Sequence, residues 1–241
     1  MAQGETAIAG VTADRYRQVA SPLHTILVLA AFAGWSYWFK VLADHLNAGA
    51  NPHRVPFYLF TILAEWILFA IVLVGVRSRG VPVSSVIGDR WHSAREVLRD
   101  IGIALGFWIV AVGMLEGVGW LLRISDEGHD VQAMVPHGGA EIAAWIALSL
   151  TAGICEETVF RGYLQKQFMA LTQSAPAGIL ISGIAFGTAH TYQGWRMVVL
   201  ISVLGTMLGV LAYWRRSVRP GMILHTWQDS LGGIAAGLMR H

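Results

Sequence analysis

Ionisable side chains interrupt the hydrophobic stretches of the second half of the sequence. They fall into three short patterns, which are Glu156, Glu157 and Arg161, then Phe186 and His190, then His225 and Asp229. A carboxylate near two imidazoles is suited to activating water for hydrolysis. An ionisable group at the centre of a bilayer costs about 2.5–3.5 kcal/mol on insertion scales, so such groups usually face the bundle interior and mark a functional site.

The first pattern separates two roles for its carboxylates. Glu157 and Arg161 are four residues apart, so on a helix they lie within about 40° of each other, which predicts an internal ion pair. Glu156 points in another direction and has no local cationic partner, which leaves it available as a general base. The alternative interpretation is a buried network of these three residues that only holds helices together.

The second and third patterns each predict two side chains on one helix face. His190 follows Phe186 by four residues, and Asp229 follows His225 by the same spacing. Hydrogen bonds between neighbouring helices would also explain each histidine by itself. Counted at 1.5 Å per residue from the predicted cytoplasmic ends, Glu156 lies roughly 15 Å deep, His190 roughly 20 Å, and His225 to Asp229 roughly 7 to 14 Å. We therefore predict that the three patterns share one layer.

Two hydrolytic mechanisms are compatible with these residues. In one, His190, His225 and the Glu156 carboxylate bind a divalent metal ion, Zn²⁺, which lowers the pKa of a bound water. In the other, Glu156 and His190 activate water directly while other groups stabilise the oxyanion. The sequence does not choose between them. Cys155 is interpreted as a small packing residue, since nothing marks it as an activated thiolate.

The composition indicates a membrane protein. Of 241 residues, 13% are charged and 55% are hydrophobic, whereas soluble domains are roughly one quarter charged. Disorder is excluded by the hydrophobicity, a disulfide scaffold by the single cysteine, and a nucleic-acid partner is not expected because no basic stripe occurs. We predict an all-α polytopic transmembrane helical bundle, a single integral membrane domain over residues 1–241, with the lipid bilayer as a partner.

Hydrophobic windows predict about seven, or six to eight, transmembrane helices. Their expected bounds are Leu23 to Ala43, Val55 to Val76, Ile101 to Leu122, Ala140 to Leu164, Ala177 to Tyr192, Met197 to Trp214 and Met222 to Leu238. Residues 1–20 are expected to form a loose, uncleaved tail, and residues 140–238 a motif-bearing catalytic core. Ser93 and Glu96 form a capping box, which predicts a helix start near Ala94.

Glycines at a spacing of four are expected to let these helices approach closely in lipid. The pairs are Gly102 with Gly106, Gly113 with Gly117, Gly183 with Gly187, Gly205 with Gly209, and Gly233 with Gly237. The isolated Glu65 and Glu116 are interpreted as hydrogen-bonded helix contacts or residues of a water-filled cavity, and Lys40 is expected to extend to the outer interface.

The basic residues predict the orientation. With the N-terminus in the cytoplasm, eleven of the 17 Lys and Arg residues, among them Arg15, Arg215, Arg216 and Arg219, fall on the cytoplasmic side, and four, including Arg240, fall on the other. Arg215, Arg216 and Arg219 are expected to set this topology and to contact anionic lipid. We expect an integral protein of a bacterial cytoplasmic membrane.

Taken together and in this order, the three motifs resemble the CPBP intramembrane proteases, which include the type II CAAX prenyl endopeptidases and bacteriocin-processing or immunity relatives. The resemblance covers roughly Ala140 to Leu238. It implies that Glu156 is the general base and His190 its partner in polarising water. It also implies supporting roles for Glu157, Arg161 and Phe186, and that His225 and Asp229 orient the site, stabilise the oxyanion or help to bind metal.

Asp229 departs from the family pattern, which often has Asn there. An ionised Asp cannot donate a hydrogen bond to an oxyanion, which favours an orienting or ligand role. The expected function is that of an endopeptidase whose partner is a peptide or protein at the membrane: a prenylated CAAX protein in a eukaryote, or a peptide, pheromone or leader segment in a bacterium. A proton-coupled transporter, or a non-catalytic immunity or scaffold relative, is the alternative. The oligomeric state is not predicted.

Overall fold

The computed structural model describes residues 16–48, 54–123 and 134–238, and within these ranges all regular structure is helical. The helices are α1 (Pro22–Ala48), α2 (Arg54–Ser78), α3 (Ser84–Ile87), α4 (Ala94–Leu121), α5 (Gly139–Glu156), a π-helix (Glu157–Leu164), α6 (Gln165–Thr172), α7 (Ala175–Ala189), a 3₁₀ turn (Thr191–Gln193), α8 (Trp195–Arg215) and α9 (Arg219–Leu238). The predicted all-helical fold class is confirmed.

Each of the seven predicted helices is present. Within the described ranges, five helical stretches are long and apolar enough to cross a membrane: α1, α2, α4, the continuous α5 to α6 stretch, and α8. The other two are shorter or more polar, because α7 has 15 residues and α9 carries His225, Gln228 and Asp229 along its 20 residues. Both of these helices bring residues to the predicted site.

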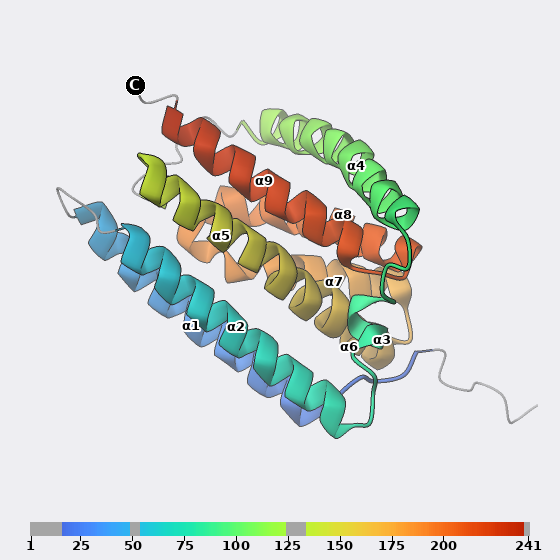
Figure 1. The fold of residues 1–241 in the computed structure, drawn as a ribbon. Coiled ribbons are helices and arrows are strands. Elements are labelled where there is room, and N and C mark those ends of the chain that lie inside the picture. Colours follow the sequence, from blue (N-terminus) through green and yellow to red (C-terminus); the bar gives the residue numbers. More distant parts are fainter. Residues whose placement is uncertain (1–15, 49–53, 124–133, 239–241) are drawn as a thin grey trace, which may run out of the picture.

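The bundle has a central group of helices with one group on either side (Figure 1). α5 packs between α2 and α9, and α7 packs against α8. α1 and α2 lie together along one edge, whereas α4 lies along the opposite edge and contacts α9 and α8. The motif-bearing helices therefore occupy the middle of the molecule.

Two hydrophobic clusters hold these groups together. The first joins α1 and α2 to the π-helix and α7, with Val28, Val72 and Phe160 among its buried side chains. The second joins α4 to α8 and α9 through residues such as Leu208 and Leu224. The central helices thus have protein on both sides.

Glycines at the centre of the bundle are closely packed, whereas those of α4 are not. A Cβ on any glycine of three predicted pairs would come within 3.1 Å of an atom elsewhere in the chain, which belongs to another helix except at Gly237, where it is the Pro136 carbonyl oxygen; the pairs are Gly183 with Gly187, Gly205 with Gly209, and Gly233 with Gly237. The same Cβ on the α4 glycines would meet no described atom within 4 Å; these are Gly102, Gly106, Gly113 and Gly117. The packing prediction holds for the first three pairs and is wrong for α4, where the small residues face no neighbouring helix of the described chain.

The start of α4 follows its capping signal. The helix begins at Ala94, and the Ser93 hydroxyl accepts a hydrogen bond from the backbone N–H of Glu96 at 3.3 Å. The Glu96 carboxylate in turn accepts from the backbone N–H of His92 at 2.8 Å. Unpaired backbone N–H groups at a helix start are satisfied in this way, so the predicted boundary is confirmed.

The predicted loose tail is shorter than expected. Residues 1–15 lie outside the described residues, but Val19 and Ala20 are buried. Both donate their backbone N–H groups to Gln167 Oε1, at 2.7 and 3.2 Å. Because a buried amide such as that of Gln167 needs hydrogen-bond partners, it holds the chain just before α1 against α6. The prediction is wrong for these last two residues of the tail.

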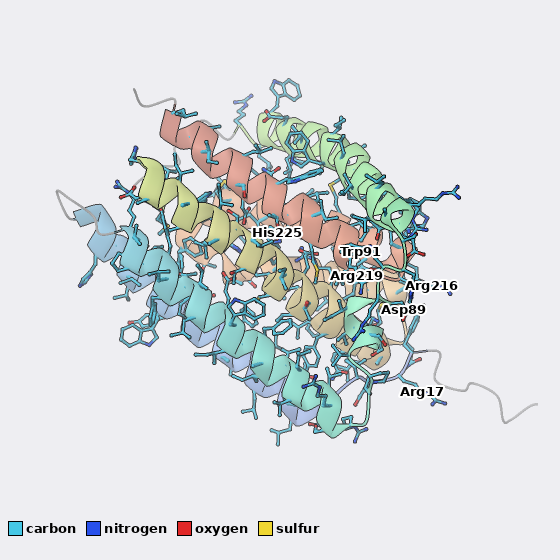
Figure 2. All side chains as sticks on the ribbon, viewed as in Figure 1. Arg17, Asp89, Trp91, Arg216, Arg219 and His225 are labelled. Atoms are coloured by element: carbon cyan, nitrogen blue, oxygen red, sulfur yellow. The ribbon has the colours of Figure 1, made fainter. Side chains whose placement is uncertain are left out.

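Basic side chains gather at one end of the bundle, where Arg17, Arg216 and Arg219 lie (Figure 2). Arg15 and Arg240, which also entered the orientation argument, lie outside the described residues. A single basic end accords with the positive-inside pattern, and its location in the cytoplasm stays a prediction. Lys40 is exposed and pairs with the Asp44 carboxylate at 3.1 Å, and its extension to the outer interface stays a prediction.

Candidate active site

Three helices bring one carboxylate and two imidazoles together. Glu156 is the last residue of α5, His190 follows the end of α7, and His225 lies in α9, at the centre of the bundle (Figure 2). Glu156 Oε2 lies 4.0 Å from His190 Nε2 and 3.9 Å from His225 Nε2. Residues separated by up to 69 positions in the chain therefore lie about 4 Å from one another.

Glu157 faces away from Glu156 and forms the ion pair that its spacing predicts. Its Oε1 lies 2.9 Å from the Arg161 guanidinium, and both side chains are buried. The guanidinium also lies over the Phe186 ring, with 4.0 Å to the ring centroid. A buried charge is tolerated only when it is paired, so the two side chains compensate each other beside the site.

His225 is held at both ring nitrogens by carboxylates. Nδ1 lies 3.1 Å from Glu157 Oε1 and donates to it, because an ionised carboxylate can only accept. Nε2 lies 3.4 Å from Asp229 Oδ2, one helical turn later. The backbone carbonyl of Asp229 accepts from Trp145 Nε1 at 2.9 Å, which ties this turn of α9 to α5. The position of the ring is therefore fixed from two sides.

His190 has a different environment. Its Nδ1 donates to the backbone carbonyl of Phe186 at 2.8 Å, which places the lone pair of the neutral ring on Nε2, the nitrogen that faces Glu156. The Phe186 ring contacts both imidazoles, and its centroid lies 4.8 Å from that of His190 and 5.7 Å from that of His225. Phe186 thus positions both rings, and the two histidines offer different chemistry.

These groups line a cavity of about 450 Å³. Glu156, His190, His225 and Asp229 all contribute to its wall, and most of the remaining lining is apolar. Aromatic rings are prominent in that lining, including those of Phe32, Trp35, Phe39, Trp145 and Tyr192. An apolar wall excludes bulk water and strengthens the electrostatic interactions among the few polar groups inside.

Glu65 of α2 is a further carboxylate of this cavity. It is buried, its Oε2 has no hydrogen-bond partner among the described residues, and it interacts electrostatically with Glu156 and His225. The sequence allowed for a cavity residue here but offered no signal that α2 lies beside α5. Glu116, which received the same interpretation, is exposed on α4. Cys155 is a buried free cysteine at the cavity wall.

The described part of the chain contains no group of three His, Cys, Asp or Glu side chains arranged to hold the zinc ion of the alternative mechanism. Ligands at about 2.0–2.2 Å around a tetrahedral Zn²⁺ would lie about 3.4 Å from one another. Glu156 is 4.0 and 3.9 Å from the two Nε2 atoms, and His225 Nε2 already faces Asp229. In this arrangement the residues therefore do not fit a tetrahedral zinc ion.

The fold and the site define the class of this protein. It is a helical membrane protein in which a buried glutamate and two histidines face one cavity. The sequence matches the Rce1-like family, type II CAAX prenyl endopeptidase Rce1-like, over residues 138–231. The similarity is to this segment of the chain, which covers α5 to α9 up to just beyond Asp229. Comparisons with curated proteins and with solved structures gave no match.

Proposed function

We propose that this protein is a CAAX-protease-like intramembrane endopeptidase that hydrolyses a peptide bond near the membrane with a water activated by Glu156 and His190. One observation carries the proposal. Glu156 Oε2 is buried without a hydrogen-bond partner among the described residues, yet it faces both Nε2 atoms at 4.0 and 3.9 Å. These separations exceed a direct hydrogen bond, and a water that enters among the three groups would give each polar atom a hydrogen-bond partner.

The reaction then needs only side chains of this site. The Glu156 carboxylate takes a proton from the water, and the lone pair of His190 Nε2 accepts a hydrogen bond from the same water and orients it. The water oxygen bonds to the carbonyl carbon of the peptide, and the carbonyl oxygen takes up the negative charge. When the C–N bond breaks, the proton held by Glu156 passes to the leaving amine.

His225 is placed to stabilise the negative oxygen. Both of its ring nitrogens face carboxylates, at 3.1 Å to Glu157 and 3.4 Å to Asp229, so a ring protonated at both positions finds an acceptor on each side. The contact of Nε2 with Asp229 is long, at 3.4 Å, so when the oxyanion forms in the cavity the single Nε2–H donates to it in place of Asp229. Asp229, as an ionised carboxylate, orients this ring and does not itself donate, which agrees with the role expected for Asp at this position.

The decisive test is Glu156→Gln, which keeps the side-chain size and removes the base. We expect cleavage of a membrane-anchored reporter peptide by the purified protein to fall by about 10²–10⁴-fold, the usual contribution of a general base. Glu116→Gln, the same change at an exposed position of α4, is the matched control and should leave cleavage unchanged. Undiminished cleavage by a folded Glu156→Gln protein would refute the assigned base.

Two further measurements separate the alternatives. A proton-coupled transporter predicts substrate flux into proteoliposomes without a peptide product, and a non-catalytic relative predicts neither. Elemental analysis and a chelator test address the metal ion, and we expect turnover to persist after chelation. Stoichiometric zinc that is required for turnover would replace direct activation by Glu156 and His190 with metal activation of the water.

A further inference from the structure

A second cavity, of about 600 Å³, lies at the basic end of the bundle. Its lining comes mainly from α3, the π-helix, α6 and the end of α8, and it shares no residue with the lining of the first cavity, although Arg161 also pairs with Glu157. Three cationic side chains line it, those of Arg161, Lys166 and Arg216, and no carboxylate does so among the described residues. Such a cavity has a positive potential and favours an anion.

Two buried residues of the cavity lining have side-chain polar atoms without a hydrogen-bond partner among the described residues. Arg161 pairs with Glu157 through one terminal nitrogen, while its NH2 has no hydrogen-bond partner in the described chain. Gln165 is 3% exposed and donates to the Gly209 carbonyl at 3.1 Å, but its Oε1 has no such partner in the same residues. Buried polar atoms are nearly always paired, so these two indicate a bound polar group.

The rim of this cavity has the residues of a membrane interface. Trp214 is 63% exposed and Tyr213 is 43% exposed, and both line the cavity beside Arg216. Trp and Tyr concentrate at the level of lipid headgroups. Arg216 lies with Arg17 and Arg219 at the same end of the bundle (Figure 2). The cavity therefore lies where phosphate groups of a bilayer would be found.

We propose that this cavity binds a phosphate-bearing polar group. The Arg161 guanidinium, the Lys166 ammonium and the Arg216 guanidinium hold the phosphate oxygens, since charge-assisted hydrogen bonds of this kind are short and strong. Gln165 Oε1 accepts from a hydroxyl or ammonium group next to the phosphate. The headgroup of an anionic lipid and a soluble phosphate ester share this chemistry, and the experiment distinguishes them.

The test measures binding to the full chain, so its outcome does not depend on the proposed protease activity. Purified protein is exchanged into nanodiscs of phosphatidylcholine with and without phosphatidylglycerol, and lipid retention is measured by native mass spectrometry. A second arm titrates glycerol 3-phosphate in detergent and follows the unfolding temperature, which a ligand specific to the folded state raises. We expect Lys166→Gln combined with Arg216→Gln to weaken binding at least tenfold.

A matched control removes the same two charges outside the cavity. Arg90→Gln combined with Arg95→Gln changes exposed residues near the same end and should alter binding less than twofold. Arg161 is left intact because it also pairs with Glu157. Where the double variant does not fold, Arg216→Gln alone, at an exposed position, carries the test, and Arg216→Lys should restore part of the binding.

The two arms identify the source of the phosphate. Retention of phosphatidylglycerol without an effect of glycerol 3-phosphate supports a lipid headgroup, and a response to glycerol 3-phosphate alone supports a soluble ester. Binding that falls equally in the cavity variant and the control would show attraction to the basic end in general and would overturn the proposed site. Failure of the folded wild-type protein to bind either probe would overturn it as well.

Discussion

The α5 to α6 stretch and α4 are both long hydrophobic helices, yet they have opposite surroundings. In the most apolar 18-residue window of Gly139–Thr172, 44% of the residues are buried in protein, whereas the corresponding window of Ala94–Leu121 has 11%. The α4 window nevertheless has the higher mean hydropathy, 2.0 against 1.4. In lipid, hydrophobicity does not drive one helix against another, and small and polar residues do. The less hydrophobic helix is therefore the one at the centre, and it carries the site.

The largest expected effect on stability comes from the central ion pair. Arg161→Gln leaves Glu157 buried without its cation, and removing one partner of a buried pair costs about 3–5 kcal/mol. We expect the free energy of unfolding in mixed micelles to fall by that amount. Arg95→Gln, an exposed arginine of α4, should change it by less than about 0.5 kcal/mol. Equal losses in both variants would remove the distinction between the two helices.

Packing at glycine sharpens the same comparison. A Cβ on Gly153 of α5 would lie 2.8 Å from the Met222 carbonyl oxygen of α9, a backbone atom that cannot move aside cheaply. Gly153→Ala should therefore lower the free energy of unfolding by about 1–3 kcal/mol, as overpacking does. Reduced cleavage is expected as well, because α9 carries His225. An unfolding curve that matches the wild type would show that α5 and α9 are not in close contact.

The smallest effect is expected on α4, and it has the opposite sign. A Cβ on Gly113 would meet no described atom within 4 Å, and Ala is favoured over Gly inside a helix by about 0.5–1 kcal/mol. Gly113→Ala should raise the free energy of unfolding by up to that amount and leave cleavage unchanged. Destabilisation would indicate that this face of α4 packs against something that the described chain does not contain.

Features set by spacing along one helix could be predicted from the sequence. The Glu157 to Arg161 pair, the capping box at Ser93 and the seven helices all depend on residues close to one another in the chain. Their geometry follows from helix periodicity, so a single sequence contains the necessary information.

Features set by which helices are neighbours were beyond prediction. Glu65 reaches the cavity because α2 lies beside α5. A Cβ on the α4 glycines would meet no described atom within 4 Å because α4 lies at the edge. Periodicity shows which residues share a helix face but not which helix packs against that face. The same glycine spacing therefore predicts close packing both in α4 and in the central helices. The meeting of Glu156, His190 and His225 came from the three motifs together and not from any one of them.

The π-helix of Glu157–Leu164 makes the site sensitive to the number of residues as well as to their identity. Its turns are wider than those of an α-helix, and the Phe160 carbonyl accepts both the N–H of Gln165, five residues later, and the Ser182 hydroxyl at 2.8 Å. Deleting one residue here would restore ordinary α-helical pitch and remove the wide turns that set Phe160 against Ser182. The Phe160 carbonyl would then lose the Ser182 hydroxyl, so this stretch should accept many substitutions more readily than a single deletion.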